Sequence, residues 1–310
     1  MKNKIAIASA FLAASSFSFA EIALTEGLSV EGFVDTSYTD SSAGDASFDL
    51  NEVEISFLFE SGAVSAQIDV DYASRTVVTG FGENEGDLVT DDSMEGDLDQ
   101  AFISYDTNGV TVSAGGMDSQ LGFEAFEAPG LYTNSLAYGA SQLPGTDIGV
   151  KVTKQLDEVS SLGVALVDEG SFIGDESAAG DTVVEVAYGR DLGNGFGAFV
   201  GYRSDAAGDD LINAYVTYET GALLLAAEIV DGEEDTDLQL LANYAYADNA
   251  SVTVRYTKEE NGLAADDDLD IITVAHNLAL ADNLRLTTEL SDNGQDDDEY
   301  EFGVSLLFTF

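Results

Sequence analysis

The chain has 310 residues with a formal net charge of −49, and 45% of its residues are hydrophobic. So acidic a chain lacks the basic patches that phosphate binding requires, which excludes nucleic acid as a partner. The hydrophobic content argues against a disordered acidic chain, and the absence of cysteine excludes disulfides and thiolate metal ligands.

The first twenty residues have the pattern of a secretory signal peptide. Lys2 and Lys4 precede an apolar run at 5–14, and Ser18-Phe19-Ala20 is a small-x-small cleavage sequence. The run is too short and too rich in Ser and Ala for a transmembrane helix, which needs about 20 apolar residues. We therefore expect residues 1–20 to be removed after Ala20 and residues 21–310 to form one exported domain. No later stretch reads as a helical span, so any membrane crossing must use strands.

Alternation of apolar and polar residues begins after residue 20 and continues to the end of the chain. In segment 250–259, Val252 and Val254 alternate with Thr253 and Arg255. Such alternation predicts strands with one apolar and one polar face. Each segment has about the 9–11 residues that a tilted strand needs to cross a bilayer, or slightly more. The sixteen predicted strands are 28–39, 48–60, 63–74, 97–106, 110–117, 146–156, 160–168, 181–190, 196–204, 210–220, 222–231, 236–247, 250–259, 269–280, 284–292 and 299–310.

Short and long connections alternate along the chain. Those after even-numbered segments are tight, such as 107–109 and 248–249, where Asn-Gly and Asp-Asn favour hairpin turns. Short periplasmic turns alternating with longer outer loops are typical of outer-membrane barrels. The longer connections, acidic or Gly-rich, are 40–47, 75–96, 118–145, 169–180, 205–209, 232–235, 260–268 and 293–298.

These patterns predict an all-β fold, a transmembrane antiparallel up-and-down β-barrel of about 16 strands with a long third outer loop. The alternative is a soluble β-sandwich, which usually divides into units of about 100 residues with Pro-rich turns. This chain has two prolines and one continuous series of hairpins. A count of 14 or 18 strands stays open, because segment 134–140 reads as a further short strand.

The third outer connection, residues 118–145, is the longest in the chain. Loops of more than about 12–15 residues are usually functional or disordered. Phe123 and Phe126 suit packing on an inner wall, whereas Glu124 and Glu127 suit an aqueous opening. One interpretation is a loop that folds into the lumen. The alternatives are a loop over the barrel mouth or one that packs on a neighbouring subunit.

Eight basic residues remain after the predicted signal peptide. An Arg or Lys facing lipid at the bilayer midplane costs about 2–4 kcal/mol, so basic residues on strands should face inward. Strand parity places four of them inward: Lys151, Arg203, Arg255 and Arg285. Arg75 ends the third predicted strand on the loop side. For any single one, an equally good interpretation is that it neutralises a nearby lumen acid such as Asp69, Asp71, Glu185, Glu228 or Glu289.

The residue inventory does not favour an enzyme. The only histidine, His276, shares parity with Val274 and Leu278 on the apolar face, so we expect a structural or subunit-contact role rather than a catalytic one. The acidic runs 266–268 and 296–298 offer oxygen ligands to Ca²⁺ or Mg²⁺, or are solvated loop tips. We predict no enzymatic activity and no cofactor, with Ca²⁺ or Mg²⁺ at the acidic outer loops left open and the metal ligands unknown.

The last strand ends the chain on an aromatic residue. Apolar residues alternate there with polar or small ones, and the apolar set is Tyr300, Phe302, Val304, Leu306, Phe308 and Phe310. This ending resembles the C-terminal strand of Gram-negative outer-membrane barrels, in which a final Phe is read by the barrel-assembly machinery. The resemblance implies that Phe308 and Phe310 carry the assembly signal.

With sixteen strands, eight outer loops and a long third loop, the mature chain resembles the general diffusion porins of Gram-negative bacteria. The resemblance implies a homotrimer in the outer membrane, in contact with the bilayer and lipopolysaccharide, that passes small hydrophilic solutes and ions. It also implies that the third loop folds into the lumen, which is the interpretation we expect. There it would form a constriction in which Glu124 and Glu127 face a basic wall. The wall residues would come from Arg75, Lys151, Arg203, Arg255 and Arg285.

The acidic excess adds an expectation of cation preference. Lipid excludes the surplus charge, which must lie in loops, turns and lumen and there concentrates cations. Inward Arg residues at the narrowest point would act against this preference. The competing function is a non-conducting outer-membrane barrel: an adhesin, a structural surface protein or a lipid enzyme.

Overall fold

The structure is a computed structural model that describes residues 21–42, 46–81, 88–124, 127–138, 143–168, 182–204, 210–232, 235–260, 268–292 and 300–310. For residues 73–81 and 88–96 it describes the backbone alone. The predicted signal peptide lies outside these residues. The described strands are β1 (Ile22–Thr25), β2 (Leu28–Ser41), β3 (Ser47–Ser61), β4 (Val64–Phe81), β5 (Leu88–Thr107), β6 (Val110–Asp118), β7 (Thr146–Asp157), β8 (Ser160–Asp168), β9 (Thr182–Gly193), β10 (Phe196–Arg203), β11 (Leu211–Thr220), β12 (Leu223–Asp231), β13 (Thr236–Ala247), β14 (Ala250–Glu259), β15 (Leu269–Ala281), β16 (Leu284–Asp292) and β17 (Tyr300–Thr309).

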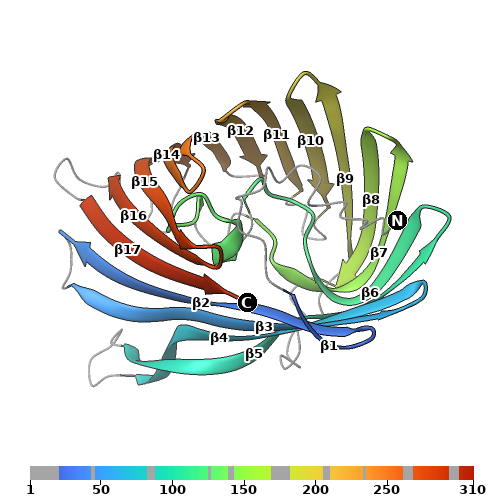
Figure 1. The fold of residues 1–310 in the computed structure, drawn as a ribbon, viewed down its shortest axis with the longest axis horizontal. Coiled ribbons are helices and arrows are strands. Elements are labelled where there is room, and N and C mark those ends of the chain that lie inside the picture. The colour runs from blue at the N-terminus through green and yellow to red at the C-terminus, as the bar shows by residue number, and fades with distance from the viewer. Residues whose placement is uncertain are drawn as a thin grey trace.

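Sixteen of these strands form a closed antiparallel ring (Figure 1). From β2 to β17 each strand pairs with the next, and the ring closes where β17 pairs with β2, with Leu306 opposite Thr36. The last residue extends this closure, because Phe310 and Gly32 exchange two 2.9 Å backbone hydrogen bonds. Closure leaves no free sheet edge within the ring, as a barrel in lipid requires. The predicted all-β barrel of about 16 strands is confirmed.

The side chains of the ring are arranged inside out relative to a soluble protein. On β14, Val254 is 46% exposed on the outside, whereas the neighbouring Thr253 and Arg255 are almost fully buried. The same alternation recurs around the ring, as with exposed Val216 on β11 and buried Thr217 beside it. An apolar exterior around a polar interior is the pattern of a lipid-embedded barrel. No helix among the described residues is long and apolar enough to cross a membrane.

The turns follow the sequence as expected. Asn108 and Gly109 join β5 to β6 with φ of 51° and 75°, and Asn194 and Gly195 join β9 to β10 with φ of 58° and 85°. Two successive positive φ angles define the tight turn that matches strand twist, and Asn-Gly adopts them most readily. Short turns and longer connections alternate around the whole ring, as predicted.

Two details of the strand prediction were wrong. The four residues of β1, which pair with β2 through Ile22 opposite Val30, were not expected. The connection predicted at 75–96 is mostly strand, because β4 continues to Phe81 and β5 begins at Leu88. Segment 134–140, the alternative further strand, adds none among its described residues, because 134–138 are irregular; residues 139–140 lie outside the described part.

Candidate functional site

The connection between β6 and β7 lies inside the ring of strands (Figure 1). We call residues 119–145 the inner segment; residues 125–126 and 139–142 within it lie outside the described part. It begins against β9, where Ser119 Oγ and the backbone N–H of Gln120 donate to the two oxygens of Glu185 at 2.6 and 2.8 Å. The inner segment thus leaves β6 and immediately binds a strand three places further around the ring.

Side chains of the barrel wall accept hydrogen bonds from the irregular backbone of the inner segment. The N–H of Gly122 donates to Asn213 Oδ1 on β11 at 3.0 Å, and the N–H of Phe123 donates to Glu228 Oε1 on β12 at 2.8 Å. Backbone buried away from water needs such partners, since it has no ladder of its own. These contacts hold Gly122 and Phe123 of the inner segment against the barrel wall.

Aromatic packing holds the same part of the inner segment. Phe123 is 2% exposed, and its ring centroid lies 5.5 Å from that of Tyr215 on β11 and 6.1 Å from that of Tyr132. Tyr138 donates its hydroxyl to Glu228 Oε2 at 3.3 Å, and burial together with that carboxylate raises the pKa of Tyr138. The predicted anchoring of Phe123 on an inner wall is therefore observed, while Phe126 lies outside the described residues.

Arg255 of β14 binds the inner segment at several points. Its Nη1 lies 3.1 Å from Glu124 Oε2, and their side chains are 2% and 4% exposed. Both Nη atoms also donate to the inner segment: to Thr133 Oγ1 (2.7 Å), to the oxygen (2.9 Å) and Oγ (2.7 Å) of Ser135, and to the oxygen of Leu136 (2.7 Å). Gln239 on β13 adds a 2.6 Å bond to the same oxygen of Glu124. Glu124 and Arg255 are thus in contact, rather than on opposite sides of an opening.

The other inward basic residues also have close partners. Arg285 on β16 donates to the backbone oxygens of Ala128, at 2.6 Å, and Leu131, at 3.3 Å. Arg203 on β10 lies 2.6 Å from Asp147 Oδ2 and 3.7 Å from Glu185 Oε2, which fits the interpretation that it neutralises lumen acids.

Lys151 on β7 donates to the backbone oxygen of Asp118 at 3.0 Å. The side chain of Arg75 lies outside the described part. Arg255 and Arg285 therefore bind the inner segment directly, and Lys151 binds the residue just before it.

Comparison with known proteins places the chain in a family. The family model described as "Putative beta-barrel porin-2, OmpL-like" matches residues 27–310. The chain belongs to this family of β-barrel porins. No curated protein sequence matches it. Among solved structures, a Salmonella typhi OmpF in complex with daunomycin aligns with a TM-score of 0.68 at 13% identity, over 94% of this chain and all of that one.

A mutant porin of Rhodopseudomonas blastica aligns with a TM-score of 0.65 at 15% identity, over 91% of this porin and all of that one. At such identities the likeness shows the fold alone, a porin-like barrel. The function of the present porin has to come from its own side chains.

Sequence analysis found the lumen acids of the porin but not their partners. One interpretation was that Glu185, Glu228 and Glu289 neutralise Arg residues. Glu185 does lie 3.7 Å from Arg203. Each of the three also accepts a backbone N–H from the inner segment, and Glu289 takes that of Asn134 at 2.5 Å. The role of Asn213 was missed altogether. Inward parity marks such side chains as polar lumen residues, but it does not say which loop amide reaches them.

Two further predicted positions lie away from the inner segment. His276 on β15 is hydrogen-bonded to Tyr246 (Tyr246 hydroxyl to Nε2, 2.7 Å), in agreement with a structural role. At the acidic run 266–268, the described residue Asp268 lies 3.1 Å from Lys258 Nζ. The remainder of that run and the run 296–298 lie outside the described residues.

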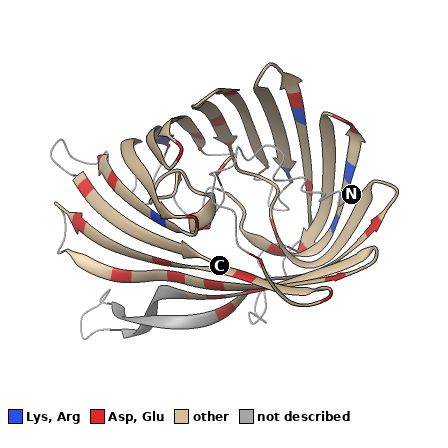
Figure 2. Cartoon of the chain, in the orientation of Figure 1, with Lys and Arg blue, Asp and Glu red and all other residues tan. Residues whose placement is uncertain are grey.

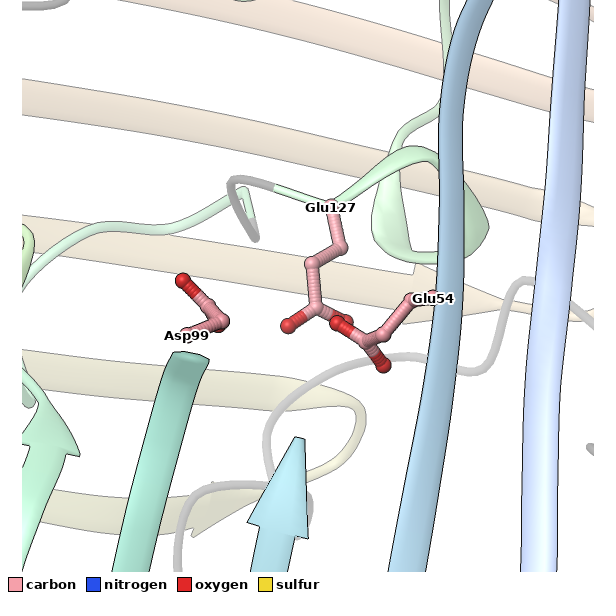
Figure 3. A group of neighbouring side chains, drawn as sticks. All are labelled: Glu54, Asp99 and Glu127. Carbon is pink, nitrogen blue, oxygen red and sulfur yellow. The ribbon is translucent and has the colours of Figure 1, made fainter. Parts of the chain in front are cut away.

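Glu127 occupies a different position from Glu124. It follows the undescribed residues 125–126 and precedes a short 3₁₀ turn, Ala128–Gly130. Its carboxylate lies beside Glu54 of β3 and Asp99 of β5 (Figure 3). It forms no ion pair with a Lys or Arg whose side chain the structure describes. Glu124 thus bonds side chains of β13 and β14. Glu127 lies beside acidic side chains of β3 and β5 instead.

Proposed function

We propose that this porin is a passive pore for small hydrophilic solutes and ions, and that the inner segment narrows it. The observation that carries the proposal is the set of contacts between the inner segment and the inner faces of β9, β11, β12, β14 and β16. A loop over the barrel mouth or on a neighbouring subunit would not meet inward side chains on so many strands. The lumen acids and amides hold a loop and form no catalytic set in the described part.

We also propose that the pore prefers cations. The described basic side chains of the lumen are hydrogen-bonded to carboxylates or carbonyl oxygens, so they are poorly placed to form a separate anion-attracting wall. β2 and β3, by contrast, carry acidic and no basic residues (Figure 2). A passage lined by one sign of charge raises the local concentration of the opposite ion.

Liposome swelling with neutral sugars of increasing size tests the pore and its narrowing together. Liposomes that contain the purified porin should admit small sugars and exclude large ones. Deletion of residues 122–130, which removes the Phe123 and Glu124 anchors, should raise the size limit. A deletion of 206–208 in a shorter outer connection is the control and should leave the limit unchanged. Lack of uptake of any sugar would favour a non-conducting barrel: an adhesin, a surface protein or a lipid enzyme.

Export and assembly complete the proposal. The signal-peptide pattern supports cleavage after Ala20, and the C-terminal strand supports insertion by the barrel-assembly machinery. The porin resemblance supports contact with lipopolysaccharide and association as a homotrimer. The assembly signal is proposed to lie at Phe308 and Phe310, whose rings stack with centroids 5.9 Å apart at the closing strand. Deletion of Phe310 should reduce the fraction of chain that reaches the membrane as a folded, heat-modifiable barrel. Ca²⁺ or Mg²⁺ at the acidic outer loops stays part of the proposal.

A further inference from the structure

Three carboxylates meet where the inner segment reaches the opposite wall of the barrel. Glu54 lies on β3, Asp99 on β5 and Glu127 on the inner segment, and one oxygen of each lies within 4.8 Å of the other two. Figure 3 shows Glu127 reaching from the inner segment toward the two strand residues. Their separation in sequence means that the fold alone brings them together.

The charge of this cluster is not balanced by a described basic side chain. Neither Glu54, Asp99 nor Glu127 forms an ion pair with a Lys or Arg whose side chain the structure describes. Burial raises the pKa of Glu127 well above its usual range. The facing carboxylates raise it further: Glu54 on β3, Asp118 on β6, Asp99 on β5 and Asp69 on β4. Bound protons or a bound cation must therefore offset the repulsion.

Buried carboxylate oxygens without a hydrogen-bond partner favour a bound cation over bound protons. Glu54 is 3% exposed; its Oε1 accepts from Ser56 Oγ at 3.0 Å, but its Oε2 is buried without a hydrogen-bond partner. Asp69, on the adjacent strand β4 and 1% exposed, also has one bonded and one unbonded oxygen. Its Oδ2 accepts a hydrogen bond from Gln67, while its Oδ1 is buried without a hydrogen-bond partner. Buried acceptors without donors are uncommon in native proteins, and an unseen ion is one of the explanations.

The ligand set indicates which cation. It consists of oxygens without His or Cys, which suits a hard divalent ion. Ca²⁺ takes 6–8 oxygens at about 2.3–2.6 Å, so its ligands lie up to about 5 Å apart, in keeping with the observed cluster. Mg²⁺ binds at about 2.0–2.1 Å in strict octahedra and would require the carboxylates to move closer together.

We propose that Glu54, Asp99 and Glu127 bind one Ca²⁺ that ties the inner segment to β3 and β5. The rest of the inner segment is anchored on β9 to β16, so the ion would fasten its far side across the lumen. Binding of the ion does not depend on conduction, and it can be measured on a barrel that passes no solute.

Equilibrium dialysis of the purified full chain in detergent against CaCl₂ tests this site, with KCl present to screen the acidic surface. Glu127→Gln should lower the affinity of one Ca²⁺ per chain by at least tenfold, as should Asp99→Asn. Glu60→Gln, an equal change of charge at an exposed position of β3, should retain it. MgCl₂ should bind more weakly than CaCl₂ at the same site.

Two results would overturn the proposal. One is a wild-type chain that binds no Ca²⁺ at pH 7.5, which would mean that protons alone balance the cluster. The other is a folded, heat-modifiable Glu127→Gln barrel that binds as many Ca²⁺ ions, as tightly, as Glu60→Gln. If the strand variant Asp99→Asn does not assemble, the wild-type measurement and the loop variant still decide the outcome.

Discussion

Replacement of Arg255 by Ala should release the inner segment from the barrel wall. The guanidinium bonds Glu124, Thr133, Ser135 and Leu136, and its side chain is 2% exposed. The substitution removes all of these bonds and leaves Glu124 as a buried carboxylate without its cation.

The size of the effect follows from that burial. Removal of one partner of a buried ion pair costs about 3–5 kcal/mol, mostly because the remaining charge is uncompensated. Water in the lumen can solvate the remaining charge and lowers this cost, so we take the lower end of the range, about 3 kcal/mol. About 3 kcal/mol shifts the docking equilibrium of the inner segment by about a hundredfold toward the free state. The double variant with Glu124→Gln should recover part of this loss, because it also removes the stranded charge.

Single-channel recording in planar bilayers measures the consequence. Arg255→Ala should show higher and noisier conductance than wild type, and the double variant should be intermediate. Arg190→Ala, at an exposed position near the end of β9, removes the same charge and should behave as wild type. Equal conductance and noise in Arg255→Ala and Arg190→Ala would refute the reasoning that this ion pair holds the inner segment.

Other predictions concern selectivity, packing and pH. The zero-current potential in a KCl gradient should show cation preference that shrinks as salt rises, because screening acts over about 8–10 Å near physiological ionic strength. Neutralisation of Glu124 and Glu127 together should lower this preference. A chloride preference at low salt would contradict the prediction of a cation-preferring pore. Phe123→Ala should loosen the inner segment by about 3–5 kcal/mol and raise conductance, whereas Phe48→Ala at an exposed site should not. Because the pKa of Glu127 is raised, its contribution to docking without Ca²⁺ is fully present below the usual carboxyl pKa and is lost as pH rises through the raised value. Conductance in a chelator should therefore rise with pH, and added Ca²⁺ should suppress the rise; a flat profile would argue against titration of this group.

Periodicity made most of the barrel predictable. The alternation of Val254 with Arg255 correctly predicted which side chains of β14 face outward and which face the lumen. The Asn-Gly sequence correctly predicted the hairpin turn at Asn108. The four residues of β1 are too few for a period to emerge. The end of β4 and the beginning of β5 were missed. The beginning of β5 carries Asp91, Asp92 and Glu95, an acidic sequence that resembles a loop, and both extensions depend on the pairing of the two strands.

The partners within the lumen were less predictable. The porin resemblance, together with length and composition, predicted that the inner segment folds inward with Phe123 as an anchor. The pairing of strand carboxylates with loop amides depends on the path of the inner segment. That segment is irregular, so its sequence has no periodicity from which its path could be predicted. The position of Glu127 is the clearest case: attraction to a basic wall was the natural expectation, yet the fold places it beside Glu54 and Asp99.

Conductance of the purified wild-type porin in a planar bilayer tests the central claim most directly. An aqueous pore through a sixteen-strand ring predicts stepwise current increments of uniform size whose current varies linearly with voltage and whose conductance grows with salt. Deletion of residues 122–130 should enlarge each step. The absence of stepwise, ohmic channels at every salt concentration, from protein shown to be folded by its heat-modifiable mobility, would contradict the account.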